Sequence, residues 1–430
     1  MLLTAGLVAV NPVVSYDARA PPESPMARTP NRRVEARRRE PLGKGLATLA
    51  VHAGAELPPP ATPPLDVPVY RASTFRFSSA AAFGRYPDER GELYLYTRYE
   101  NPTVRAVERR LAALEGAEGA LAFGSGMAAI STALFAHLSA GDSLVASSAL
   151  YGGSYRLLRD VLPRFDVSPL FLEPDRIASA PWPSGARLVY VETPINPTLR
   201  LVDLRALSAR CREEGALLFV DGTFGSPVLQ RPLALGADLV LESATKILGG
   251  HSDLLAGVAA GSPRVLGPIA ALRRALGGIL SPDDAFQLAR SLKTLPIRVE
   301  RQCRSAADLA RRLERDRRPE RVIHPSLRSH PDHALARRQM SGFGWMLTIA
   351  LRGGLPAARR FLDRLELFAR ATSLGGVESV ASIPVDTSHV GQSPGELRRA
   401  GVTPGMVRLS IGLEEPDDLW RDLDRALGRA

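Results

Sequence analysis

A regular alternation of short apolar segments with helical segments, which begins near residue 101, most constrains the fold of this chain. The apolar segments that predict strands are 119–123, 143–147, 187–193, 216–223 and 237–243. They are hydrophobic along almost their whole length, which is typical of strands covered by helices on both faces. The pattern predicts an α/β protein with a mostly parallel sheet. Ligands of such sheets bind at the carboxyl ends of the strands.

Four segments are expected along the chain. Residues 1–45 hold a large share of the +10 net charge and predict a basic, disordered tail, with Met26 as an alternative start. Residues 46–100 contain "ELPPPATPPLDVPVY", whose prolines lack backbone donors and predict an extended arm. We expect the large α/β domain in residues 101–290, and a linker helix with a smaller C-terminal α/β domain in residues 291–430.

Composition argues against several classes of protein. No apolar run reaches the roughly 18 residues that a membrane span needs, and no positive charge precedes the first apolar stretch, as it would in a secretory signal. Cys211 and Cys303 are too few for a disulfide framework, so a cytoplasmic location is expected. The tail lacks interleaved aromatic residues, a helix-turn-helix pattern and zinc spacing. We therefore expect no nucleic-acid partner and no metal.

Lysine is rare in this chain. Lysine and arginine together number 55, yet lysine occurs only at Lys44, Lys246 and Lys293. Lys246 stands in "SATKILGG", directly after an apolar strand and beside the hydroxyl residues Ser243 and Thr245. A surface lysine is the ordinary explanation, but this chain uses arginine on its surface. Because arginine stays protonated and is no nucleophile, the position indicates a need for a primary amine.

Two further features stand at predicted strand ends. Gly124 and Gly126 in "GSGM" lie between a strand and a helix N-terminus, where free amides and the helix dipole suit a phosphate. Asp221 ends an apolar strand, where a buried carboxylate needs a cationic partner. Alone, each is explained by a tight turn or a helix cap. Together with Lys246 they match pyridoxal 5'-phosphate, which has a phosphate, a ring nitrogen and an aldehyde.

Motifs of one known family occur in the family's order from about residue 48 to the C-terminus. They are "TLAVHAG", "YTRYENPT", "GSGMAAI", "LYGGSY", "ETPINPT", "VDGTFGSPVLQRPLALGADLV", "SATKILGGHSD", "SLGGVES" and "VRLSIGLEE". The chain resembles the Cys/Met-metabolism (trans-sulfuration) family of pyridoxal-phosphate enzymes, which includes cystathionine γ-synthase, γ-lyase and β-lyase and methionine γ-lyase. The resemblance implies the PLP-dependent transferase fold type I, which is aspartate-aminotransferase-like. It also implies a homo-oligomer, a dimer of dimers whose active sites are shared across the dimer, with the arm contacting the neighbouring subunit.

The resemblance implies a cofactor role for each matching residue. Lys246 is expected to form the Schiff base and to carry protons. Asp221 is expected to pair with the ring nitrogen, and Tyr151 to stack on the ring. The residues expected to hold the phosphate are Gly126, Met127, Ser243 and Thr245 and, from the neighbouring subunit, Tyr96 and Arg98.

Substrate contacts are implied in the same way. Arg408, helped by Ser373, is expected to bind the α-carboxylate as a bidentate fork. Asn196 is expected to contact the ring's phenolic oxygen or the substrate carboxylate. Tyr96 is also the expected base for the incoming amine, so Lys246, Tyr96 and Tyr151 are the expected catalytic residues.

The chain departs from the family at several positions. Gly222 stands where the family usually has Asn, and Glu100 stands where it usually has Gly. Many γ-lyases have a glutamate that recognises cystathionine near the position of Ser382, and "DTSH" replaces a common Met-Thr-His pattern. The cofactor motifs are intact, whereas the wall expected to face the substrate side chain is altered.

The sequence therefore predicts γ-elimination or γ-replacement on cystathionine or activated homoserine, with "YGGSY" and "SLGGVES" favouring γ-chemistry. The alternative within the family is a cystathionine β-lyase or methionine γ-lyase activity. The alternative outside it is a catalytically idle binding protein with the same fold.

Overall fold

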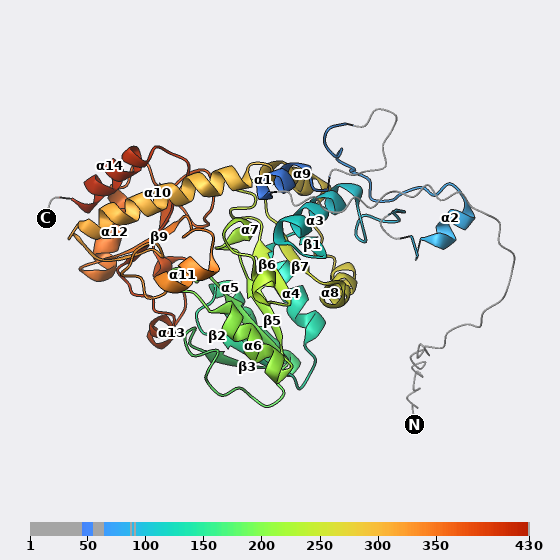
Figure 1. The fold of residues 1–430 in the computed structure, drawn as a ribbon, viewed down its shortest axis with the longest axis horizontal. Helices are drawn as coiled ribbons and strands as arrows, with labels where there is room; N and C mark the ends of the chain where they lie inside the picture. Colours follow the sequence, from blue (N-terminus) through green and yellow to red (C-terminus); the bar gives the residue numbers. More distant parts are fainter. Residues whose placement is uncertain (1–44, 55–63, 87, 90–91, 429–430) are drawn as a thin grey trace, which may run out of the picture. The chain divides into compact units, whose positions relative to one another are not determined.

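The computed structural model describes residues 45–54, 64–86, 88–89 and 92–428. The predicted tail, apart from Gly45, and the proline-rich stretch up to residue 63 lie outside the described residues. The described part contains a seven-stranded sheet and, later in the chain, a five-stranded sheet (Figure 1). No helix in this part is long and apolar enough to cross a membrane. The division into domains at residues 100 and 290 stays a prediction.

The seven-stranded sheet has the order β1-β7-β6-β5-β4-β2-β3. Its strands are β1 (Gly119–Phe123), β2 (Ser143–Ser147), β3 (Ser168–Leu172), β4 (Leu188–Glu192), β5 (Leu217–Asp221), β6 (Leu239–Ser243) and β7 (Gly257–Gly261). Strands β2 to β6 pair in parallel, and β7 runs antiparallel to both β1 and β6. The predicted mostly parallel α/β class is confirmed. The sequence prediction lacked β3 and β7; β7 is "GVAAG", whose small residues have little strand propensity and are held by two neighbouring strands.

Both faces of this sheet are buried, which explains the continuous hydrophobic runs. On β5, Leu218 and Val220 pack in one core cluster while Phe219 packs in the other. Successive side chains of a strand point to opposite faces, so each face receives every second residue. The polar residues that end β4, β5 and β6 are therefore exceptions in otherwise apolar strands.

The described residues form fourteen α-helices. They are α1 (Leu46–His52), α2 (Ala80–Arg85), α3 (Pro102–Glu115), α4 (Gly126–His137), α5 (Gly152–Arg156), α6 (Leu204–Glu214), α7 (Ser226–Leu229), α8 (Pro263–Leu276), α9 (Pro282–Leu292), α10 (Leu295–Arg315), α11 (His333–Gln339), α12 (Gly354–Arg364), α13 (Pro394–Arg399) and α14 (Pro416–Leu427). Helix α3 begins as predicted, because the Asn101 side chain accepts a hydrogen bond from the Thr103 amide and Pro102 takes the first position. It ends at Gly116, which adopts a left-handed conformation (φ 68°).

The five-stranded sheet has the order β10-β11-β12-β9-β8. Its strands are β8 (Pro319–Ile323), β9 (Met346–Leu351), β10 (Ala369–Arg370), β11 (Val380–Ser382) and β12 (Met406–Ser410). Helix α10 contacts α1 near one end and β8, β9 and α14 along its length (Figure 1). The predicted linker helix, expected to be either one long helix or a broken one, is broken between α9 and α10, where Pro296 in the first turn of α10 cannot donate a helical hydrogen bond.

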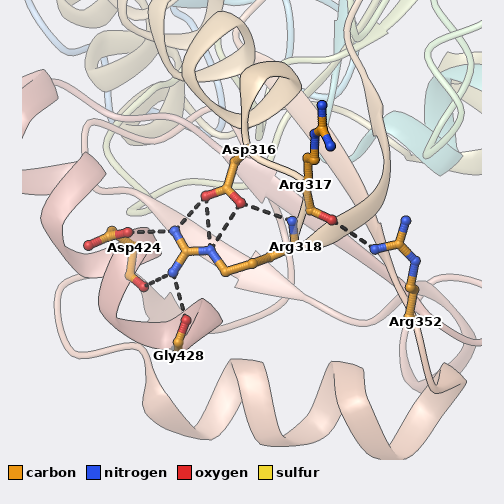
Figure 2. A network of polar contacts seen from close by, with 6 residues as sticks. All are labelled: Asp316, Arg317, Arg318, Arg352, Asp424 and Gly428. Carbon is orange, nitrogen blue, oxygen red and sulfur yellow. Dashed lines mark hydrogen bonds and ion pairs between the residues drawn. The ribbon is translucent and has the colours of Figure 1, made fainter. Parts of the chain in front are cut away.

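An arginine network holds the end of α14 to the turn before β8. Figure 2 shows Arg318 at its centre, with its guanidinium between Asp316 and Asp424. Arg318 Nε lies 3.0 Å from both Asp316 oxygens, and Nη1 donates to the Gly428 carbonyl at 2.7 Å. Arg352 donates separately to the Arg317 carbonyl at 2.7 Å. The network ties the C-terminal helix to the second sheet.

Candidate active site

A cavity of about 550 Å³ lies at the carboxyl ends of β4, β5 and β6 and also receives residues of the second sheet. The predicted site residues that line it are Gly126, Met127, Tyr151, Asn196, Asp221, Ser243, Thr245, Lys246, Ser373 and Arg408. These residues are far apart in the chain, and the fold brings them together at one edge of the sheet. Tyr96 and Arg98 do not line this cavity.

Lys246 lies in the turn that follows β6, with its side chain at the cavity. Its Nζ donates a hydrogen bond to Ser373 Oγ at 2.8 Å. Burial, and then the nearby positive charge of Arg408, lower the pKa of Lys246 to about 8. A lysine with a lowered pKa has a larger neutral fraction near neutral pH, and the neutral amine is the nucleophile.

Asp221 ends β5 as an almost fully buried carboxylate. Its Oδ1 accepts a hydrogen bond from the Thr223 amide at 3.0 Å, and its Oδ2 lies 3.4 Å from the Tyr190 hydroxyl. No cationic side chain of the described residues forms an ion pair with it, and burial raises the pKa of Asp221. A buried carboxylate in this condition suits a protonated nitrogen of a bound ring.

A narrow cradle lies where α4 begins. Ser125 caps the helix, since its Oγ accepts a hydrogen bond from the Ala128 amide at 3.0 Å, and Gly126 and Met127 form the first turn. A Cβ on Gly126 would come within 2.8 Å of Ser243 Cβ, so only glycine leaves the cradle open. The Thr245 hydroxyl is engaged with the backbone of Ala256. The first-turn amides and Ser243 therefore suit a phosphate group.

Arg408 on β12 is a buried guanidinium without an acidic partner among the described residues. Nη1 donates to Asn196 Oδ1 at 3.1 Å, and Nη2 donates to the Ser373 carbonyl at 2.8 Å. Burial lowers the pKa of Arg408 to about 10, although Glu192 opposes this effect. A buried guanidinium held by neutral groups suits a carboxylate brought by the substrate.

Tyr151 stands at the start of α5 with its ring exposed. A Cβ on Gly153 would come within 2.5 Å of the ring edge, so the glycine lets the ring lie close to the helix. The Tyr151 amide donates to Glu192 Oε2 at 2.7 Å. Glu192 also lines the cavity and was missed as a site residue, although it ends an apolar strand in the same way as Asp221.

Tyr96 and Arg98 lie in a separate region. The Arg98 guanidinium lies 4.8 Å from the centre of the Tyr99 ring and 5.7 Å from that of Tyr96, and Nη1 donates to the Arg274 carbonyl at 2.5 Å. Arg274 in turn lies 3.5 Å from the carboxylate of Glu100. That these residues serve a neighbouring subunit's cofactor stays a prediction.

Apart from the predicted site residues and Glu192, the cavity is lined by neutral residues, which form its neutral wall: Ser125, Ile130, Thr223, Phe224, Leu255, Thr372, Leu374, Thr387 and Ser388. Ser382 does not belong to it, because it pairs with Arg408 in the sheet and its buried Oγ has no hydrogen-bond partner among the described residues. The altered "DTSH" motif itself contributes Thr387 and Ser388 to the lining of the cavity.

Comparison with known proteins supports the resemblance. Residues 47–428 match the profile of the family described as Cys/Met metabolism PLP-dependent enzyme. The chain belongs to this family. An L-methionine gamma-lyase of Fusobacterium nucleatum subsp. polymorphum is 40% identical over 389 residues, covering 89% of this chain and 98% of the relative. A cystathionine beta-lyase of Coxiella burnetii is 39% identical, covering 88% and 97%.

A solved structure is similar as well. The crystal structure of metB from Corynebacterium glutamicum superposes with a TM-score of 0.83 at 36% identity, covering 90% of this chain and 98% of that one. The family confirms that the chain is a pyridoxal-phosphate-dependent enzyme of sulfur amino-acid metabolism, with carbon–sulfur lyases and transferases among its relatives.

Proposed function

We propose that the enzyme is a carbon–sulfur lyase for amino acids with an uncharged side chain, with L-methionine as the leading substrate. The supporting observation is the set of charges at the cavity. The charged side chains that line it are Glu192, Asp221, Lys246 and Arg408, and the wall beyond them is neutral. Cystathionine would bring a second ammonium and a second carboxylate, and such groups are costly to desolvate without charged partners. We therefore propose a methionine γ-lyase activity, which the sequence analysis gave as an alternative, in place of a reaction on cystathionine or activated homoserine.

The cofactor and substrate roles expected from the sequence belong to this proposal. When bound, pyridoxal phosphate supplies an aldehyde for the substrate amine and a ring that takes up the electrons released at Cα. Arg408 binds the α-carboxylate, and Asp221 holds a proton on the ring nitrogen. Lys246 takes the proton from Cα and then moves protons at Cβ and Cγ. Tyr151 covers one face of the ring and excludes water from it.

The overall reaction balances with one water. L-Methionine and water give methanethiol, 2-oxobutyrate and ammonia. The test follows the thiol and the keto acid released from L-methionine, L-cystathionine and O-acetylhomoserine, with the Lys246→Ala variant as the control. We expect the highest kcat/KM with methionine. A preference for cystathionine would refute the argument from the neutral wall.

A second candidate is a cystathionine β-lyase, which the relative from Coxiella burnetii favours. This activity would release pyruvate and homocysteine from cystathionine, so the same assay separates the two.

A shared active site in a homo-oligomer is the second part of the proposal. Tyr96 and Arg98 lie away from their own chain's cavity, and Phe83, Leu276 and Ile297 are large apolar side chains exposed on the described chain. Refolding Arg98→Ala and Lys246→Ala chains together would form hybrids with one intact site. Recovery of about a quarter of the wild-type activity is expected for random dimers; no recovery would refute sharing. Both cysteines are free, which supports a reducing compartment such as the cytoplasm.

A further inference from the structure

Glu192 is a buried carboxylate without a place in the roles above. It ends β4 level with Asp221 on β5 and is 3% exposed. Its Oε2 accepts a hydrogen bond from the Tyr151 amide at 2.7 Å, and its Oε1 accepts one from the Asn196 amide at 3.1 Å. One carboxylate therefore binds the backbones of two loops whose side chains both line the cavity.

The second of these loops leads directly to the other polar groups of the site. Asn196 Oδ1 accepts from Arg408 Nη1 at 3.1 Å, and the Ser373 carbonyl accepts from Arg408 Nη2 at 2.8 Å. Ser373 Oγ accepts from Lys246 Nζ at 2.8 Å. The chain of contacts is continuous from Glu192 to the two cationic side chains of the cavity.

We propose that Glu192 is a positioning residue that fixes the ring-covering Tyr151 and the carboxylate-binding pair Asn196 and Arg408 in one geometry. It acts through the backbone amides of Tyr151 and Asn196, not by touching the reacting atoms. The inference rests on the proposed function and adds one residue that fixes the geometry of that site. Hydrogen bonds from amides to a carboxylate are shorter and stronger than those between neutral groups.

Burying an acidic side chain at this position destabilises the folded protein, and a neutral residue with a purely structural role would avoid that cost. Burial and the adjacent Asp221 raise the pKa of Glu192 to about 8, while the two amides and Arg408 oppose this rise. Two buried acids side by side at strand ends repel each other when both are ionised. Such arrangements are concentrated at functional sites, where groups must be held in one geometry.

The test compares Glu192→Gln and Glu192→Asp with a matched control, Glu115→Gln. Glu115 is a 2% exposed carboxylate on α3 and does not line the cavity. In Glu192→Gln the amide NH₂ faces one of the two backbone N–H groups, so one hydrogen bond is lost. In Glu192→Asp the carboxyl group stays, but the shorter side chain cannot reach both amides.

The measurements are the visible circular dichroism of the bound cofactor, and kcat and KM with L-methionine, on each holoenzyme. Both Glu192 variants should change the amplitude of the cofactor band and lower kcat/KM by at least about tenfold, because misplaced catalytic groups lose rate. The Glu115→Gln control should retain the wild-type band and turnover.

A Glu192 variant with wild-type cofactor dichroism and kinetics would overturn the inference, even if its thermal midpoint fell. If Glu192→Gln fails to fold, Glu192→Asp gives the answer alone. Wild-type protein that releases no thiol from any tested substrate would refute the proposed function. The dichroism comparison would still decide the role of Glu192.

Discussion

A pair of buried acids, one at the end of α3 and one on β6, predicts an unusual dependence of stability on pH. Glu115 ends α3 and Glu242 lies on β6, and they are 2% and 3% exposed. Neither oxygen of Glu115 accepts a hydrogen bond from a described donor group, and the two carboxyl groups face each other. Gly222 leaves space beside Glu242, since a Cβ there would lie 3.6 Å from Glu242 Oε1.

The size of the effect follows from the shifted pKa values. Burial raises the pKa of Glu115 from 4.5 to about 8, and burial with the charge of Glu115 raises the pKa of Glu242 well above its ordinary value. The folded protein thus keeps a proton on Glu115 that the unfolded chain releases above about pH 4.5. The proton on Glu115 alone lowers stability by about 1.4 kcal/mol for each pH unit in this window, so its share of the step from pH 5 to pH 7 is about 3 kcal/mol.

The perturbation is Glu115→Gln, because an amide has no proton to lose and donates a hydrogen bond to Glu242. Urea unfolding of the variant and the wild type at pH 5 and pH 7 measures the difference. We expect the variant to gain about 3 kcal/mol over the wild type between the two pH values. The exposed Glu118→Gln is the control and should not gain. Parallel pH profiles for Glu115→Gln and wild type would refute the reasoning.

Three other predictions concern the site and the fold. The pKa of Lys246, lowered to about 8, predicts that apo-protein captures pyridoxal phosphate faster as pH rises and that the rate levels off above about pH 8. The rate is followed by absorbance, and a rate that keeps rising up to pH 10 would contradict the prediction. Arg408→Lys should lower kcat/KM about a hundredfold while leaving the cofactor absorption unchanged, because an ammonium cannot replace a two-pronged fork; a loss of less than about threefold would argue against carboxylate binding. Arg318→Ala should lower the free energy of unfolding by about 1 kcal/mol without loss of turnover, since it removes partly exposed ion pairs to Asp316 and Asp424. Arg352→Ala, which loses one exposed hydrogen bond, should cost less in the same urea titration, and equal losses would contradict the network's role.

Much of the cofactor site could be predicted because its chemistry is local in the sequence. Asp221 and Lys246 each stand at or just after the end of a strand, and parallel strands place their carboxyl ends at one edge of a sheet. Glu192 follows the same rule and could have been found by it. Strand β7 could not, since its small residues form a strand only through pairing with β1 and β6.

The sequence by itself determined the alternation of strands and helices, and it determined that a lone amine and a carboxylate stand at strand ends, because both are written in local periodicity and residue type. Only the tertiary structure decided which distant segments close the cavity. It places Ser373 and Arg408 of the second region against Lys246 and Asn196, and it puts Ser388 rather than Ser382 in the wall. The direction of a side chain depends on strand register and on the path of the connecting loops, which no short stretch of sequence encodes.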